Sequence, residues 1–528
     1  METGPSTILL CLASILAAAG PELAAQTDEQ IASVVALSGA SDAESLDEQE
    51  LERFSRYLEH PLEINVSGAS RLVSSGLFTR YQAASLIDYR ARNGDVLSYA
   101  ELSTIEGFTE ESVRRLAPFV SLRSTRLAGV PASDSLPVRH DAVLRGAIRG
   151  GDLCWGLKYS CGFGEVAEAS LALRTVYGGR QFPPSSWTGN VTLHGRKHLG
   201  KVILGDYAAR FGQGLSLWSG MSLSGLLASS SFVRRPGGIS PSWSYSGIMT
   251  HRGLAADLEF GRFVLTAMSS FPGLREKCEG VRAEGISYLA GGNLTWYGPM
   301  AQAGLTFYYE SAPLGGPLYQ SGGKVSADFR AGFRGADTFG EYAFDCVNEV
   351  FAAVTGAIIP VFGEWKLALA ARRYPEAWDA SWAGSLKAWT KAADENALSI
   401  GLEKGSACLA ADFAFRDSDP RTRQCKATIK VPLQLNGKSV LTIRVSERYR
   451  PYEELLVFRT GARMDIDYSS SGLSARYGAS EGEAWTGRLR AEGLLCRSFA
   501  VLSYLEGGRK GADWTAYIRG GVFLVDNW

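Results

Sequence analysis

Through most of residues 138–528 the side chains alternate between apolar and polar, and this period of two constrains the fold more than any other feature. Within residues 324–334 every odd position is apolar and every even position is polar or glycine. Successive side chains of a β-strand point to opposite faces, so the pattern predicts strands with one apolar and one polar face. Two further pairs of alternating runs meet at Asn436-Gly437 and Gly261-Arg262, which predicts hairpins there. We expect an all-β antiparallel structure over residues 138–528.

Such a chain can form a soluble sandwich or a membrane-spanning barrel, and three features favour the barrel. The polar faces carry charges such as Lys324 and Asp328. Aromatic clusters, as in residues 296–297 and 307–309, are typical of the girdles at membrane interfaces. The sequence ends on Trp528, like the aromatic-ended last strand of barrel proteins. The prediction is a transmembrane barrel of about 16–22 strands in contact with outer-membrane lipid. A soluble, secreted β-rich protein is the alternative.

The first residues indicate export. Residues 8–19 form an apolar run of signal-peptide length, too short to span a bilayer, and small residues follow it. We expect a signal peptide over residues 1–25. The cysteines beyond it are scattered and lack CxxC spacing, so they indicate neither a zinc site nor a dense disulfide framework.

Residues 26–122 follow a helical period, and residues 61–122 contain one pattern twice. Leu77-Phe78-Thr79 and Gly107-Phe108-Thr109 each precede a helix whose apolar residues lie on one face. Each threonine is a favourable N-cap, because its hydroxyl accepts a backbone N–H of the first helical turn. The sequence predicts a small all-α domain of two helix–turn–helix pairs, joined to the barrel by a polar linker over residues 123–137.

Two stretches resemble a family of outer-membrane β-barrel proteins of Gram-negative bacteria with an N-terminal helix-hairpin-helix domain. The first, over residues 61–120, contains PLEIN, YR, NG, EL, EGF and PFV, and is similar to the doubled hairpin of competence-type DNA-binding domains. The second is VILGDYAARFGQGLSLWSG, over residues 202–220. The resemblance implies a periplasmic helical domain followed by an outer-membrane barrel, and it implies no reaction.

DNA binding is the function that the resemblance to a doubled hairpin implies, and two features of the sequence argue against it. Such hairpins approach phosphate through a Gly-apolar-Gly turn, and only Gly107 of the four expected glycines is present. Residues 27–126 carry 10 Lys or Arg and 16 Asp or Glu, a net charge of 10 − 16 = −6, whereas phosphate binding requires a basic surface. We expect the turns at residues 77–79 and 107–109 to dock a periplasmic protein. An outer-membrane-tethered DNA-binding role in DNA uptake is the alternative.

The second of these stretches, residues 202–220, supplies a group of candidate site residues in the barrel. They are Gly205, Asp206, Tyr207, Arg210, Phe211, Gly212, Gln213 and Gly214. These residues could line a lumenal site. Alternatively, the three glycines enforce a tight turn or an inward bend of the strand, with Asp206 paired to Arg210 across it.

No constellation of catalytic or metal-ligating residues is found. His194 and His198 share a face of a predicted strand–turn–strand without a nearby carboxylate, and no GxSxG, HExxH or phosphate-loop motif is present. We therefore expect no enzyme activity, no metal and no cofactor. The expected function is that of a channel, transport or assembly component with a helical docking or plug domain.

Overall fold

The computed structural model describes residues 60–123 and, from residue 138 onward, the strands and most of their connections. Before residue 60 it describes residues 34, 37, 53, 54 and 56–58. The longest segments outside the described residues are 1–33, 38–52, 124–137, 272–287, 312–321 and 470–483. The predicted signal peptide and nearly all of the predicted linker therefore lie outside the described residues.

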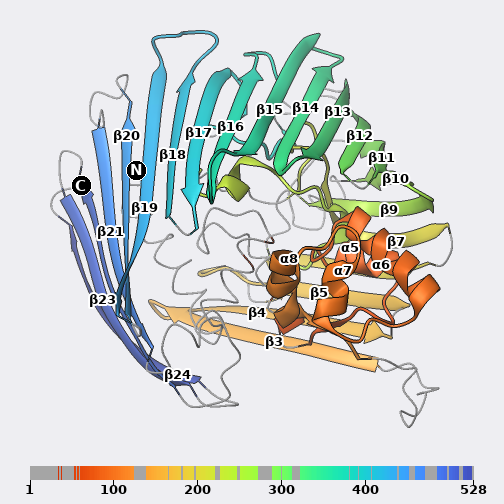
Figure 1. Ribbon diagram of the computed structural model, residues 1–528, viewed down its shortest axis with the longest axis horizontal. Coiled ribbons are helices and arrows are strands. Elements are labelled where there is room, and N and C mark those ends of the chain that lie inside the picture. The colour runs from red at the N-terminus through yellow and green to blue at the C-terminus, as the bar shows by residue number, and fades with distance from the viewer. Residues whose placement is uncertain are drawn as a thin grey trace.

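A closed barrel of 22 strands, β3 to β24, forms most of the molecule (Figure 1). From β3 to β8 and from β9 to β24 each strand pairs antiparallel with the next along the chain, and β7 pairs with both β8 and β9. The first eleven are β3 (Val138–Arg149), β4 (Asp152–Phe163), β5 (Ala167–Arg174), β6 (Ser186–His194), β7 (Leu199–Arg210), β8 (Gly238–Pro241), β9 (His251–Phe260), β10 (Phe263–Ser270), β11 (Tyr288–Tyr297), β12 (Ala301–Ser311) and β13 (Gly322–Phe333). The others are β14 (Ala336–Asp345), β15 (Val350–Pro360), β16 (Trp365–Tyr374), β17 (Glu395–Lys404), β18 (Ala407–Phe415), β19 (Arg423–Asn436), β20 (Ser439–Tyr449), β21 (Phe458–Ser469), β22 (Ala484–Leu495), β23 (Phe499–Lys510) and β24 (Thr515–Val525).

The barrel confirms the predicted strands and hairpins and lies at the upper limit of the predicted strand number. Phe260 pairs with Phe263 around the turn at Gly261, whose φ is 61°. Asn436 pairs with Ser439, so the hairpin predicted at Asn436-Gly437 is present. The turn residues 437–438 themselves lie outside the described residues.

The barrel exposes its apolar face and buries its polar face. In β13 the side chains of Lys324, Ser326 and Asp328 are buried, while Val325 between them is 41% exposed. In β12 Thr306 is buried, and Leu305 is 56% exposed. A soluble sandwich would show the opposite distribution, because its apolar faces pack against each other.

The predicted aromatic girdle is only partly on the outer surface. Phe307 and Tyr309 are exposed there, whereas Tyr308 and Tyr297 point inward and are buried. The period of two is the reason, since neighbours in one strand point to opposite faces.

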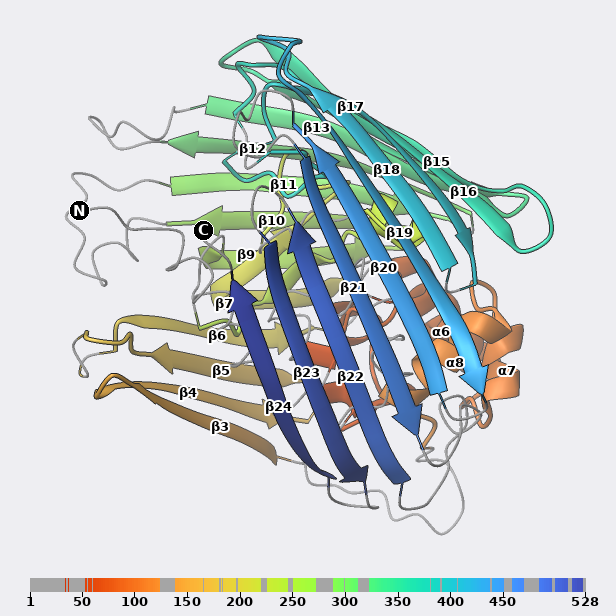
Figure 2. The ribbon, with the colours of Figure 1, turned by 90° about the vertical axis from the view of Figure 1, so that its left-hand side faces the viewer.

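The two ends of the barrel differ in the length of their connections. At one end, which we call the short-turn end, strands are joined by turns such as residues 261–262, 334–335 and 405–406. At the opposite end, connections such as residues 271–287 and 375–394 are much longer. Figure 2 shows the helices at the short-turn end.

The helical segment, residues 60–123, contains α5 (Ala69–Ser74), α6 (Arg80–Asn93), α7 (Tyr99–Thr104), α8 (Glu110–Leu116) and the 3₁₀ helix η2 (Ala117–Phe119). Thr79 and Thr109 are the N-caps of α6 and α8, as predicted, and both form capping boxes. Two short strands, β1 (Leu62–Glu63) and β2 (Val120–Ser121), pair in parallel and bring the ends of the segment together. None of the helices in the described part of the chain is long and apolar enough to cross a bilayer.

The core of the helical segment corrects one prediction. The rings of Phe78 and Phe108 pack edge to face with their centroids 6.1 Å apart, and both side chains are buried, as is Leu77. The prediction that these turn residues form an exposed docking surface is therefore wrong for Leu77, Phe78 and Phe108. The physical reason is that the duplicated pair must bury an apolar face, and the two equivalent phenylalanines meet where its halves join.

Replacing Phe78 by alanine is expected to destabilise the helical segment by about 3–5 kcal/mol, because the lost ring leaves a cavity. The rate of tryptic cleavage within residues 60–123 of the full-length protein measures this effect. Leu97→Ala is the matched control, because Leu97 is 59% exposed. Equal cleavage rates for the two variants would contradict the core assignment.

Candidate functional site

The helical segment is seated on the inner wall of the barrel at the short-turn end, beside β5 and β7 (Figure 1). The seat is polar. Arg56 Nη1 lies 2.5 Å from Glu168 Oε1 of β5, and Lys201 Nζ of β7 donates to Ser74 Oγ of α5 at 2.7 Å. Because all these strands expose their apolar side to the outside, only the polar side is available to the helices.

Asp257 of β9 is the central charge of the seat. Its Oδ2 lies 3.5 Å from Lys201 Nζ and 3.9 Å from Arg80 Nη2 at the start of α6. The side chains of Lys201 and Asp257 are only 1% and 3% exposed. A buried ion pair of this kind depends on both partners, since removing either leaves a charge without compensation.

The ion pair with Glu168 keeps Arg56 in its charged form. Burial alone would lower the pKa of Arg56, but the charge of Glu168 and the hydrogen bond between them outweigh burial and raise this pKa above its ordinary value. Arg56 also lies over the ring of Trp243, 4.4 Å from its centroid. Arg56 therefore stays charged throughout the physiological pH range.

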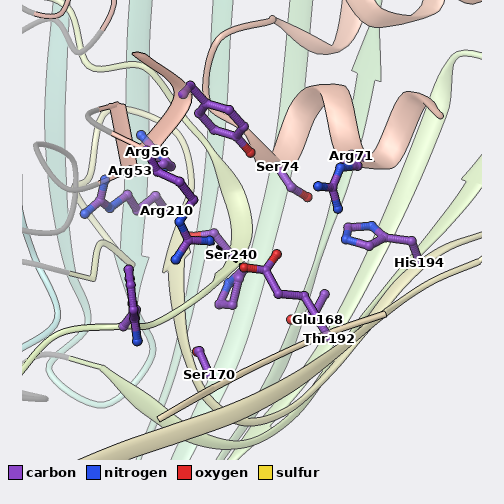
Figure 3. A pocket seen from close by; sticks show the side chains of 13 residues that line it. Arg53, Arg56, Arg71, Ser74, Glu168, Ser170, Thr192, His194, Arg210 and Ser240 are labelled. Carbon is purple, nitrogen blue, oxygen red and sulfur yellow. Dashed lines mark hydrogen bonds and ion pairs between the residues drawn. The ribbon is translucent and has the colours of Figure 1, made fainter. Parts of the chain in front are cut away.

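A cavity of about 90 Å³ lies within the seat, between the helices and the barrel wall (Figure 3). Arg53, Arg56 and Arg71 reach it from the helical side. The barrel contributes hydroxyl groups and larger side chains that include those of Glu168, His194, Arg210 and Trp243.

A second arrangement lies inside the barrel, where β7 leaves the wall. β6 pairs with β7 only as far as Gly205, and beyond it Tyr207–Arg210 pair with β8. Gly205 has a φ of 102°, and a Cβ there would lie 2.3 Å from the carbonyl oxygen of Gly189. Only glycine fits this position, so the alternative of an inward bend enforced by glycine is the one that the structure shows.

Asp206 fills the gap that this bend opens. Its two carboxylate oxygens each accept a hydrogen bond of 2.9 Å from the guanidinium of Arg252, and Oδ2 also accepts the backbone N–H of Gly189. The predicted pair of Asp206 with Arg210 is therefore wrong. Arg210 instead donates from Nε to the carbonyl oxygen of Ser219, because the chain folds back on itself there.

The residues after β7 form a turn around one buried carboxylate, that of Glu341 in β14. Glu341 accepts the backbone N–H groups of Gln213, Leu215 and Ser216 at 2.7, 2.9 and 3.1 Å, and the hydroxyl of Ser216 at 2.9 Å. Gly212 has a φ of 57°, and a Cβ there would lie 2.5 Å from Glu341 Oε2. We call residues 211–219 the inner turn.

A second segment inside the barrel, residues 375–394, packs on the inner turn. Trp218 N–H donates to the carbonyl oxygen of Trp382, and Gly384 N–H donates to that of Gly214, both at 2.8 Å. Asp379 ties this segment to the wall through Lys324, at 2.6 Å. Burial alone would raise the pKa of Asp379, but the hydrogen bond and the charge of Lys324 lower it.

The structure brings the predicted barrel residues together as one element that enters the lumen. Tyr207 is fully buried and stacks on His251, Phe211 is buried nearby, and Gln213 Oε1 accepts the backbone N–H of Arg234. Sequence reasoning missed Lys201, Asp257 and Glu341, which stand at ordinary polar positions of alternating strands. Nothing in their local sequence separates them from other inward-facing polar residues.

Among the described residues, no group of three His, Cys, Asp or Glu side chains is arranged to hold a metal ion. The fold and the site define a closed antiparallel β-barrel with an apolar exterior, a charged interior and chain segments held inside it.

No protein-family model matches the sequence, and no curated protein matches it. Among solved structures, Wzi of Escherichia coli, an outer-membrane carbohydrate-binding β-barrel involved in group 1 capsule assembly, is 9% identical with a TM-score of 0.33, over 85% of this chain and 93% of Wzi. OccK2 of Pseudomonas aeruginosa, solved in complex with glucuronate, is 11% identical with a TM-score of 0.27, over 73% of this chain and 97% of OccK2. At these values the similarities define no family for the chain.

Proposed function

We propose that this protein is an exported, non-enzymatic β-barrel of the outer membrane, a channel, transport or assembly component whose lumen is occupied by its own chain. The observation that carries the proposal is the inverted burial: large apolar side chains such as Leu144 and Ile518, 76% and 83% exposed, cover the outside. Water disfavours such a surface, whereas the hydrocarbon interior of a bilayer accepts it.

The helical segment then lies on the periplasmic side. Bacterial outer-membrane barrels have short periplasmic turns and longer extracellular loops. The helices lie at the short-turn end (Figure 2), which supports this orientation.

The helical segment acts as a plug that docks on its own barrel. This proposal rests on the seat, in which Arg56, Arg80 and Ser74 meet Glu168, Asp257 and Lys201. The inner turn and residues 375–394 narrow the lumen further toward the other end. Transport through the barrel requires movement of at least one of these elements.

The two helix–turn–helix pairs are consistent with a doubled helix-hairpin-helix domain. The docked position of this domain nevertheless disfavours DNA binding. Arg80, the first residue of α6, lies against Asp257 and Gly238 of the barrel. A duplex could not reach the preceding turn, residues 77–79, without displacing the helical segment. The second turn, residues 106–110, carries Glu106 and Glu110, which repel phosphate.

Cell fractionation combined with gel mobility tests the membrane proposal. The mature protein is expected in the outer-membrane fraction, and it should migrate faster on a gel before heating in detergent than after heating. Recovery of the mature protein in the soluble periplasm would contradict the proposal. Titration of the full-length protein with duplex DNA at several salt concentrations tests the alternative: micromolar affinity with a steep negative salt slope would favour DNA uptake.

A further inference from the structure

We propose that solutes pass along the inner face of β19–β24, and that this face makes the protein selective for small anions. The first observation is the distribution of charge along the chain. Residues 423–528, which contain β19–β24 and their connections, carry 16 Lys or Arg and 11 Asp or Glu, a net charge of 16 − 11 = +5. The whole chain has a net charge of −1, so the preceding residues carry −1 − 5 = −6. Every acid of residues 423–528 is counted, so ion pairs among these residues leave the excess unchanged.

Cations of neighbouring strands stand opposite one another on this inner face. Thr428 of β19 is buried and Ile429 is 41% exposed, so the even-numbered residues of β19 face inward. Lys430 is one of them; it lies directly opposite Arg444 of β20, which lies opposite Arg463 of β21. Like charges at directly opposite positions destabilise a sheet. A row of three such cations is expected where the row attracts an anion.

Cations also outnumber acids over the inward-facing positions of β19–β24 that the structure describes. The cations are Lys426, Lys430, Arg444, Arg448, Arg463, Arg490 and Arg519. The acids are Asp465, Glu492 and Glu506. Asp465 is shared by two arginines, since Arg463 Nε and Arg490 Nε lie 2.7 and 2.6 Å from its carboxylate. Seven cations against three acids give 7 − 3 = +4, with these ion pairs included.

This face is less covered than the wall formed by β7–β14. On that wall Lys201, Asp257 and Glu341 are at most 3% exposed, because the helical segment and the inner turn lie on them. On β24 the side chain of Arg519 is 42% exposed, and Glu492 of β22 is exposed as well. A solute that enters when one of the inner elements moves therefore meets the face of β19–β24.

A cavity of about 230 Å³ lies against the same face. Lys426 and Arg448 line it from the wall, and Lys387 lines it from the segment inside the barrel. The acid in its lining is Asp412 of β18, whose two carboxylate oxygens accept hydrogen bonds from Arg372 at 2.7 and 2.8 Å. The volume has room for several water molecules, at about 30 Å³ each in the liquid. A small hydrated anion therefore has space beside the wall.

Charge on the lumenal wall selects among ions. A unit positive charge about 4 Å from an anion in water raises the local anion concentration roughly fivefold and lowers that of a cation to the same extent. Arg and Lys side chains are the groups that line anion pores. Salt screens the effect, since the Debye length falls from about 10 Å at 0.1 M to about 3 Å at 1 M. The selectivity should therefore be strongest in dilute salt.

The reversal potential in planar bilayers across a KCl gradient tests the proposal. Wild type and Asp257→Ala are both expected to pass chloride in preference to potassium. Arg444→Glu should lower the chloride-to-potassium permeability ratio by roughly fivefold or more. The new carboxylate stands between Lys430 and Arg463, so the variant is expected to fold, and heat-dependent gel mobility checks this.

Arg423→Glu is the matched control. Arg423 is an exposed residue at an odd-numbered position of β19, so it faces outward and its replacement should leave the ratio unchanged. Raising the KCl concentration from about 0.1 M to about 1 M should move the wild-type ratio toward one. A wild-type ratio at or below one in dilute salt, or an equal fall in the two variants, would overturn the proposal.

The inference rests on the proposed function, as it names the class of solute, and the two can fail separately. A protein that fractionates with the outer membrane and conducts without preferring chloride would refute the anion selectivity alone. If neither wild type nor Asp257→Ala conducts, the transport role and the selectivity are both refuted, and the membrane location stands.

Discussion

Replacing Asp257 by alanine is expected to release the helical segment from the barrel. The change leaves Lys201 and Arg80, with side chains 1% and 11% exposed, without their shared carboxylate. Loss of one partner from a buried ion pair costs about 3–5 kcal/mol. The released segment loses the stabilisation provided by the barrel wall, so trypsin should cleave it faster, and single-channel conductance in planar bilayers should rise.

The Asp337→Ala variant is the control for this experiment. Asp337 pairs with Arg330 in the same barrel at 2.5 Å, but the two side chains are 26% and 32% exposed and lie in β14 and β13. A partly exposed pair contributes about 0–1 kcal/mol, so this variant should leave cleavage and conductance unchanged. The seat assignment fails if Asp257→Ala cleaves no faster than Asp337→Ala.

Replacing Glu341 by alanine is expected to loosen the inner turn. The change removes the acceptor of three backbone N–H groups and one hydroxyl in the fully buried interior. Each buried donor left without an acceptor costs about 1–3 kcal/mol, and water entering the lumen recovers part of this. We therefore expect the stability of the inner turn to fall by a net amount of about 3–5 kcal/mol. Hydrogen exchange of residues 211–219 should then become much faster.

Glu364→Ala provides the comparison, since Glu364 is an exposed acid in the turn between β15 and β16. It should leave exchange of the inner turn unchanged. If Asp257→Ala raises conductance and Glu341→Ala does not, the helical segment is the main barrier; the reverse result assigns that role to the inner turn. No change of exchange in Glu341→Ala would contradict the support that we assign to this carboxylate.

Much of the fold could be predicted from the sequence, because strand periodicity and turn chemistry are local. The hairpin at Gly261 and the caps at Thr79 and Thr109 were predictable for this reason. The inward bend after Gly205 was predictable as one of two alternatives, since three glycines within ten residues permit positive φ.

The partners within the site could not be predicted. Asp206 pairs with Arg252 rather than Arg210, although Arg210 is much nearer in sequence. Phe78 and Phe108 stand in equivalent turns that appear open in sequence, yet they close on each other. Both outcomes depend on how whole elements pack.

The sequence by itself determined the helical period of residues 26–122 and the strand period of residues 138–528. These periods predict a small helical part followed by a long antiparallel β part. The sequence determines them because each strand or helix imposes its period on neighbouring residues. Only the tertiary structure decided that the apolar face of the alternation points outward, and which polar residues meet. Ser74 and Lys201 are 127 residues apart and meet because the helical segment docks on the barrel wall. Gln213 and Glu341 are 128 residues apart and meet because the inner turn enters the closed barrel. The alternating pattern is identical for a barrel and a sandwich until the sheet closes.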